Sequence, residues 1–144
     1  MPCSVPEDPA ADEGSAVVEF VSLGTLLLVP VVYFVLSVAQ VQAGAFAVVA
    51  ATQQAGQVLA QAEPGGVSDA GLDAAAQLAA ADQGFGPGRL ALRVECSDGT
   101  CASPGAVATV HGSLEVGLPL VPGFTDLDVA VLTSSATVVV GRYG

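Results

Sequence analysis

The chain has almost no positive charge. It contains no lysine and three arginines against fourteen acidic residues in 144, which gives a net charge of −11. Proteins that hold nucleic acid or anionic lipid electrostatically need clustered lysine and arginine. The composition therefore excludes both as electrostatic partners.

Aromatic and metal-binding residues are also scarce. Tryptophan is absent, so neither a large aromatic core nor a sugar-stacking surface is expected. The single histidine, His111, and the cysteines Cys3, Cys96 and Cys101 do not have zinc-site spacing. No serine lies in a nucleophile elbow, and no glycine-rich loop joins a strand to a helix. We expect no catalytic residues, no metal, no cofactor and no small-molecule substrate.

Long apolar runs, in contrast, are present. Residues 15–39 hold one charged residue, Glu19. A helix rises about 1.5 Å per residue, so this segment would measure roughly 37 Å, enough to cross a hydrocarbon core of about 30 Å. It predicts a single transmembrane helix. An acid near the edge of such a helix still needs a partner, yet no basic residue precedes Arg89.

A cut after Gly14 would supply that partner. The new α-amino group on Ser15 would be a cation four residues before Glu19, on the same helix face. In a bundle of such helices, the carboxylate of one subunit can neutralise the amine of its neighbour within apolar surroundings. The charge pair would then set the register of assembly.

The sequence Gly-Ser-Ala-Val-Val-Glu-Phe, residues 14–20, resembles the processing site of type IV prepilins. In these proteins glycine precedes the cut and glutamate is the fifth residue of the remaining chain. With Pro30 in the apolar run, the segment is more specifically similar to the TadE family of tight-adherence (Flp) pilus assembly proteins. Residues 41–48 and 51–57 are similar to the helix that follows the span in actinobacterial members.

This resemblance implies a minor pilin or pseudopilin that a prepilin peptidase cuts between Gly14 and Ser15. It also implies assembly through Glu19 and Phe20, with other pilin-like subunits and an assembly platform in the membrane as partners. The N-terminus would be cytoplasmic and the C-terminal domain extracytoplasmic, in a surface pilus once the subunit is incorporated.

The segments on either side of the cut allow other interpretations. Residues 1–14 carry three prolines and four acids, a composition that predicts a disordered leader. Ser37-Val38-Ala39 is a small-x-small site at which signal peptidase could release a secreted product. An uncleaved helix would instead be a plain single-pass anchor. Either outcome would make the chain an extracytoplasmic binding module without a pilus role.

The helix is predicted to continue beyond the span as a stem over residues 40–62, which are rich in alanine and glutamine. Small residues recur there every four positions, at Ala43, Ala47, Ala51, Ala55 and Leu59. This face can pack against the chain's own sheet or form a seam between subunits. Within the span, Pro30 predicts a kink, which either fits subunits into a bundle or has no role.

Residues 63–144 predict a small extracytoplasmic α+β domain. Ser68 is a suitable N-cap for a second, short helix that ends near Gln83. From Arg89 the apolar period changes to two, which indicates strands over residues 90–96, 108–118 and 128–142. A proline-bearing loop covers residues 118–124. We expect three antiparallel strands packed on the long helix, a pilin-like α+β fold.

Cys96 and Cys101 flank Ser-Asp-Gly-Thr, a turn-forming insert. Such a turn can bring the two Cα atoms within the roughly 4.4 to 6.8 Å that a disulfide needs. In an extracytoplasmic setting this predicts a disulfide, the alternative being free or metal-binding thiols.

Overall fold

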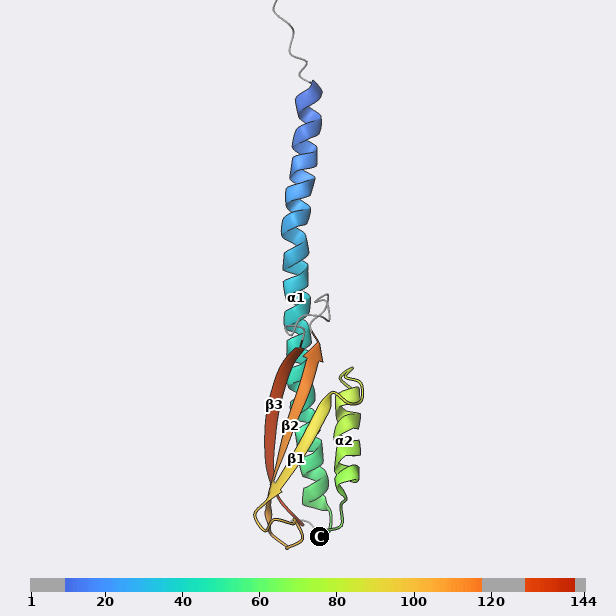
Figure 1. Cartoon of the computed structure of the whole chain (residues 1–144), viewed down its shortest axis with the longest axis vertical. Helices are drawn as coiled ribbons and strands as arrows, with labels where there is room; N and C mark the ends of the chain where they lie inside the picture. Colours follow the sequence, from blue (N-terminus) through green and yellow to red (C-terminus); the bar gives the residue numbers. More distant parts are fainter. Residues whose placement is uncertain (1–9, 118–128, 142–144) are drawn as a thin grey trace, which may run out of the picture. The chain divides into compact units, whose positions relative to one another are not determined.

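The computed structural model of the chain describes residues 10–117 and 129–141 (Figure 1). It divides into two compact units, Met1–Leu36 and Ser37–Gly144. Helix α1 (Ala10–Gln61) begins in the first unit and ends in the second. The whole proline-bearing loop predicted at residues 118–124 lies outside the described residues.

The first unit is the N-terminal part of α1. Because the helix begins at Ala10, residues 10–14 are helical, and the prediction of a disordered leader up to residue 14 is wrong for them. Alanine, which stands at positions 10 and 11, has a high intrinsic helix propensity. The helix continues through Pro30. A single proline here removes one hydrogen bond without ending the helix.

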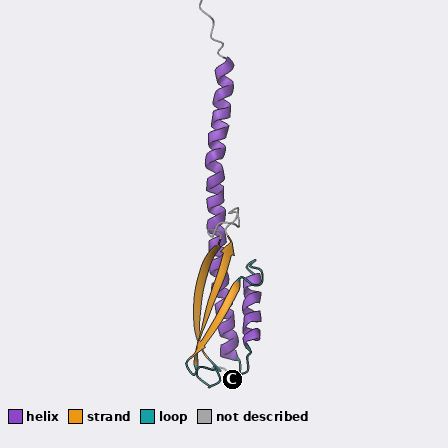
Figure 2. Ribbon diagram, viewed as in Figure 1, coloured by secondary structure: helices purple, strands orange, loops and turns teal. Residues whose placement is uncertain are grey.

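The second unit contains an antiparallel sheet of three described strands in the order β1-β2-β3 (Figure 2). They are β1 (Leu90–Cys96), β2 (Val107–Gly117) and β3 (Val129–Val139). The first matches its predicted bounds, and the second is shifted by one residue. The third ends before the predicted residue 142, since Gly141 has φ 68° and turns the chain. The long helix, the short helix and the antiparallel sheet make this an α+β fold.

The C-terminal part of α1 packs on one face of this sheet. Ala47, Ala51 and Ala55 are fully buried, and Leu59 is 5% exposed. The predicted stripe of small residues therefore packs within the chain's own core along this stretch. Glutamines 53, 57 and 61 lie on an exposed face of the same helix.

Two glycines let the helix lie close to the sheet. A Cβ added at Gly112 in β2 would lie 2.6 Å from the Thr52 methyl carbon, and one added at Gly44 would lie 2.9 Å from Cδ1 of Leu132. Thr52 is fully buried, and its hydroxyl forms hydrogen bonds with the Val48 carbonyl at 3.0 Å and the Ser134 hydroxyl at 3.2 Å. The close contact between α1 and the sheet therefore depends on the absence of a side chain at Gly44 and Gly112.

Helix α2 (Asp69–Ala81) packs beside β1 (Figure 1). The Ser68 hydroxyl caps it as predicted, accepting a hydrogen bond from the Gly71 amide at 3.2 Å. Its buried side chains are Leu72, Ala76 and Ala80. Beyond α2, Phe85 is 7% exposed and belongs to the core.

Candidate functional site

The N-terminal part of α1 is long and apolar enough to cross a membrane. Its most apolar 18-residue window has a mean hydropathy of 2.3, and none of that window is buried within the structure. Phe20 is 77% exposed and Leu26 is 74% exposed. Apolar surface in water costs about 25 cal/mol per Å² relative to burial. The apolar surface of this part of α1 would therefore be stabilised by contact with lipid or with another protein.

The predicted processing and assembly residues lie in this same stretch. Gly14 and Ser15 are inside α1, Glu19 follows Ser15 by four residues, and Phe20 comes next. Both ion pairs between described residues are on the sheet, where Glu95 meets Arg93 at 2.9 Å and His111 at 3.9 Å. Within residues 10–117 and 129–141, Glu19 therefore has no cationic partner.

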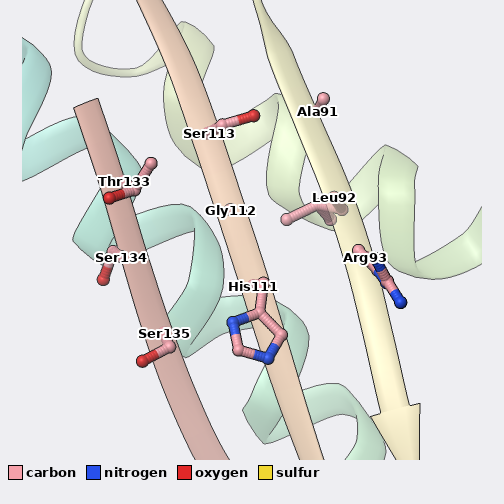
Figure 3. A pocket seen from close by; sticks show the side chains of 9 residues that line it. All are labelled: Ala91, Leu92, Arg93, His111, Gly112, Ser113, Thr133, Ser134 and Ser135. Atoms are coloured by element: carbon pink, nitrogen blue, oxygen red, sulfur yellow. The ribbon is translucent and has the colours of Figure 1, made fainter. Parts of the chain in front are cut away.

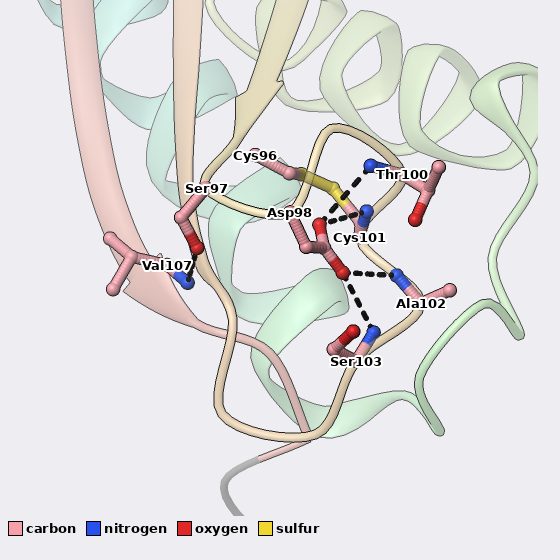
Figure 4. Close-up of a disulfide and its surroundings, with 8 residues drawn as sticks. All are labelled: Cys96, Ser97, Asp98, Thr100, Cys101, Ala102, Ser103 and Val107. Atoms are coloured by element: carbon pink, nitrogen blue, oxygen red, sulfur yellow. Dashed lines mark hydrogen bonds between the residues drawn. A yellow bond between two sulfur atoms is a disulfide. The ribbon is translucent and has the colours of Figure 1, made fainter.

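The cysteine turn closes one end of the domain (Figure 4). Cys96 ends β1 and forms a disulfide with Cys101, the two Cα atoms lying 5.3 Å apart, within the range predicted from the turn. Cys101 adopts a left-handed backbone conformation, with φ 57°. The disulfide and this turn together fix the chain between β1 and β2.

Asp98 organises the loop that the disulfide closes. Its carboxylate accepts hydrogen bonds from four successive backbone amides, two on each oxygen (Figure 4). The shortest come from Cys101 at 2.7 Å and Ser103 at 2.8 Å. These bonds, with that from Ser103 the largest contribution, hold the pKa of Asp98 well below its ordinary value. The loop is therefore stabilised by the ionised form of this side chain.

Replacing Asp98 by asparagine is expected to loosen the loop. The amide nitrogen of asparagine cannot accept, so the hydrogen bonds to one oxygen are lost. Because folding lowers the pKa from about 3.9, the ionised group stabilises the fold above about pH 4, and this contribution fades as the pH falls below it. Urea unfolding in detergent should show wild-type stability falling more steeply between about pH 4 and 2 than that of the variant.

Asp82→Asn, at the exposed end of α2, is the matched control for this measurement. It should keep the wild-type pH profile. If Asp98→Asn also keeps that profile, Asp98 does not hold the loop.

The outer face of the sheet carries a shallow open depression of about 460 Å³ (Figure 3). Its lining residues come from all three strands: Ala91, Leu92, Arg93, His111, Gly112, Ser113, Thr133, Ser134 and Ser135. His111 is exposed here. Its ion-pair partner is Glu95, and no described hydrogen bond joins it to a serine hydroxyl. The described geometry therefore provides no serine nucleophile paired with a base.

Comparison of the chain with known protein families, with curated proteins and with solved structures found no match.

Proposed function

We propose that this chain is a minor pilin or pseudopilin, similar to TadE, of a tight-adherence pilus or related secretion system. Residues 15–39 cross the membrane, a prepilin peptidase cuts after Gly14, and Glu19 and Phe20 take part in assembly with other pilin-like subunits. The observation that carries the proposal is the position of Glu19. It is a lone acid in a membrane-length helix, and the described residues give it no cationic partner.

The energetics of that acid support a paired role. A carboxylate at the centre of a bilayer costs about 2.5 to 3.5 kcal/mol on insertion scales, and less near the edge. The α-amino group that cleavage creates on Ser15 has a pKa of about 7.7 to 8.0, so most of it is cationic at neutral pH. In a helix the two groups lie on one face. Processing therefore turns an uncompensated charge into one half of an ion pair.

The disulfide supports an extracytoplasmic position for the domain. Disulfides persist outside the reducing cytoplasm, and the Cys96–Cys101 bridge closes a loop at the end of β1. With a single span, the N-terminus is then cytoplasmic. This is the orientation in which a prepilin peptidase meets a leader.

Fractionation of cells that carry a tight-adherence assembly system tests this function. The chain, expressed in full and processed by the cell, should occur in filaments sheared from the cell surface and in the membrane. When the assembly ATPase is deleted, the sheared pool should be lost while the membrane pool remains. A distribution that does not change on this deletion would instead indicate the alternative function, a tethered or secreted binding module.

A further inference from the structure

We propose that the groove between β1 and α2 binds an extended, positively charged segment of a partner protein, which adds to the free edge of β1 as a short strand. This inference goes beyond the pilin-like function and does not depend on cleavage after Gly14. It rests on the shape of the groove, on the unpaired edge of β1, and on the charge at the rim.

The groove consists of two adjoining hollows of about 310 and 280 Å³, which share Asp69, Leu72 and Val94. At one end the Gln77 side chain joins α2 to β1, its Nε2 donating to the Leu90 carbonyl at 3.0 Å. From there the two elements diverge toward the disulfide loop (Figure 1). Leu59 of α1 contributes to the wider end. The groove is thus a wedge that is open beside the second half of β1.

The hydrogen-bonding register turns part of the β1 backbone toward this wedge. The Ser97 amide donates to Val107 and the Arg89 carbonyl accepts from Glu115, both at 2.9 Å. In an antiparallel pair these positions alternate, so odd-numbered residues of β1 bond to β2 and even-numbered ones face away. The Leu90 carbonyl obeys this rule, since it accepts from Gln77.

The backbone amides and carbonyls of Leu92 and Val94 consequently point to the free edge. Within the described residues, no hydrogen bond satisfies them on that side. An unpaired strand edge is a template for another strand. Residues 92–96 extend about 16 Å at roughly 3.3 Å per residue, enough to pair with a segment of about five residues.

The side chains of the groove define the chemistry of that segment. Leu92 and Val94 are half-buried, so their exposed apolar surface is available to every second residue of the segment, while the buried Leu72 lines the groove beneath them. The exposed acids Asp69 and Asp73 line the groove, and neither has an ion pair with a described cation. Glu63 lines the wider end. Alternating apolar and basic residues complement this surface.

Fluorescence anisotropy with labelled hexapeptides tests the proposal on the full chain in detergent micelles. The peptide Arg-Val-Lys-Val-Arg-Val should bind, and its counterpart with Glu in place of Arg and Lys should bind at least about tenfold more weakly. N-methylation of the peptide amides that pair with β1 should weaken binding by about tenfold, while methylation of the alternate amides should have little effect. Empty micelles give the background.

Variants of the rim acids test the site itself. The pair Asp69→Asn and Asp73→Asn should weaken binding of the basic peptide by about tenfold. The pair Asp69→Glu and Asp73→Glu keeps the charge and should bind normally, as should Glu115→Gln on the outer face of the sheet. Circular dichroism checks that each variant folds. If the variant with both asparagines does not fold, the N-methylated peptides, which are tested on the wild-type chain, still test the proposal.

Three results would overturn the proposal. They are failure of the basic peptide to bind, equal binding of the acidic peptide, and equal sensitivity to N-methylation at both sets of positions. A loss of binding in Glu115→Gln as large as in the Asn pair would also overturn it, because it would indicate non-specific charge attraction.

Discussion

Replacing Glu19 by glutamine is expected to abolish filament incorporation while leaving the membrane-bound amount of the chain unchanged. Glutamine has nearly the same shape, but it cannot form an ion pair with the α-amino group of Ser15. Removing one partner of a buried ion pair costs about 3 to 5 kcal/mol, because the other charge remains uncompensated. A loss of about 3 kcal/mol corresponds to a more than hundredfold weaker association.

The measurement is the ratio of chain in sheared filaments to chain in membranes. Glu13→Gln is the matched control, since Glu13 lies one residue before Gly14 and is removed with the leader. It should incorporate normally. Glu19→Asp keeps the charge on a shorter side chain and should be incorporated into filaments in part. Normal incorporation of Glu19→Gln would remove the basis of the assembly role.

Replacing Gly112 by alanine is expected to destabilise the second unit by about 1 to 3 kcal/mol, the usual cost of an overpacked core. The added Cβ would lie 2.6 Å from Cγ2 of Thr52, 3.4 Å from Val48 and 3.5 Å from Leu92. Thr52 and Val48 are buried, and the hydrogen bonds of Thr52 hold its side chain in place. Neither the helix nor the sheet can therefore move away without losing other contacts.

Urea unfolding followed by circular dichroism measures this loss as a lower midpoint with an unchanged slope. Gly86→Ala is the control, because nothing lies within 4 Å of a Cβ added there. Thr52→Ser removes the methyl group and keeps the hydroxyl, so combining it with Gly112→Ala should recover part of the stability. If Gly112→Ala and Gly86→Ala unfold at the same midpoint, the helix does not depend on a glycine at position 112.

Much of the fold could be predicted from residue periodicity. The period of two from Leu90 to Cys96 fixed β1, and the caps and breakers around α2 fixed its bounds, because these signals are local. The four-residue spacing of alanines identified the buried face of α1 but not what covers it. Only the folded structure could show whether this face packs against the chain's own sheet or is left for a seam between subunits.

The burial of Phe85 could not be predicted, because a competing local signal hid it. Phe85 lies among glycines and a proline, a context typical of an exposed loop, yet it is buried. Asp98 is within a turn-forming insert, and an aspartate that bonds successive amides is a known property of such turns. An isolated glycine in a strand, such as Gly112, indicates close backbone approach. The roles of Asp98 and Gly112 are therefore indicated by local sequence, whereas the burial of Phe85 is set by tertiary packing.

The candidate sites also differ in how far they could be predicted from sequence. The relation between Gly14, Ser15 and Glu19 is a matter of spacing along one helix, so it could be predicted from sequence. The groove between β1 and α2 depends on strand register and on the divergence of two elements. Neither can be derived from local pattern, because both are set by tertiary packing.

We propose that Glu19 has its role in assembly only when Ser15 is a free N-terminus. Mass spectrometry of the mature chain, purified from membranes of cells that contain a prepilin peptidase, tests this directly. The expected N-terminus is Ser15. A mature chain that begins at Met1, or at Gln40 after a cut behind Ala39, would contradict it.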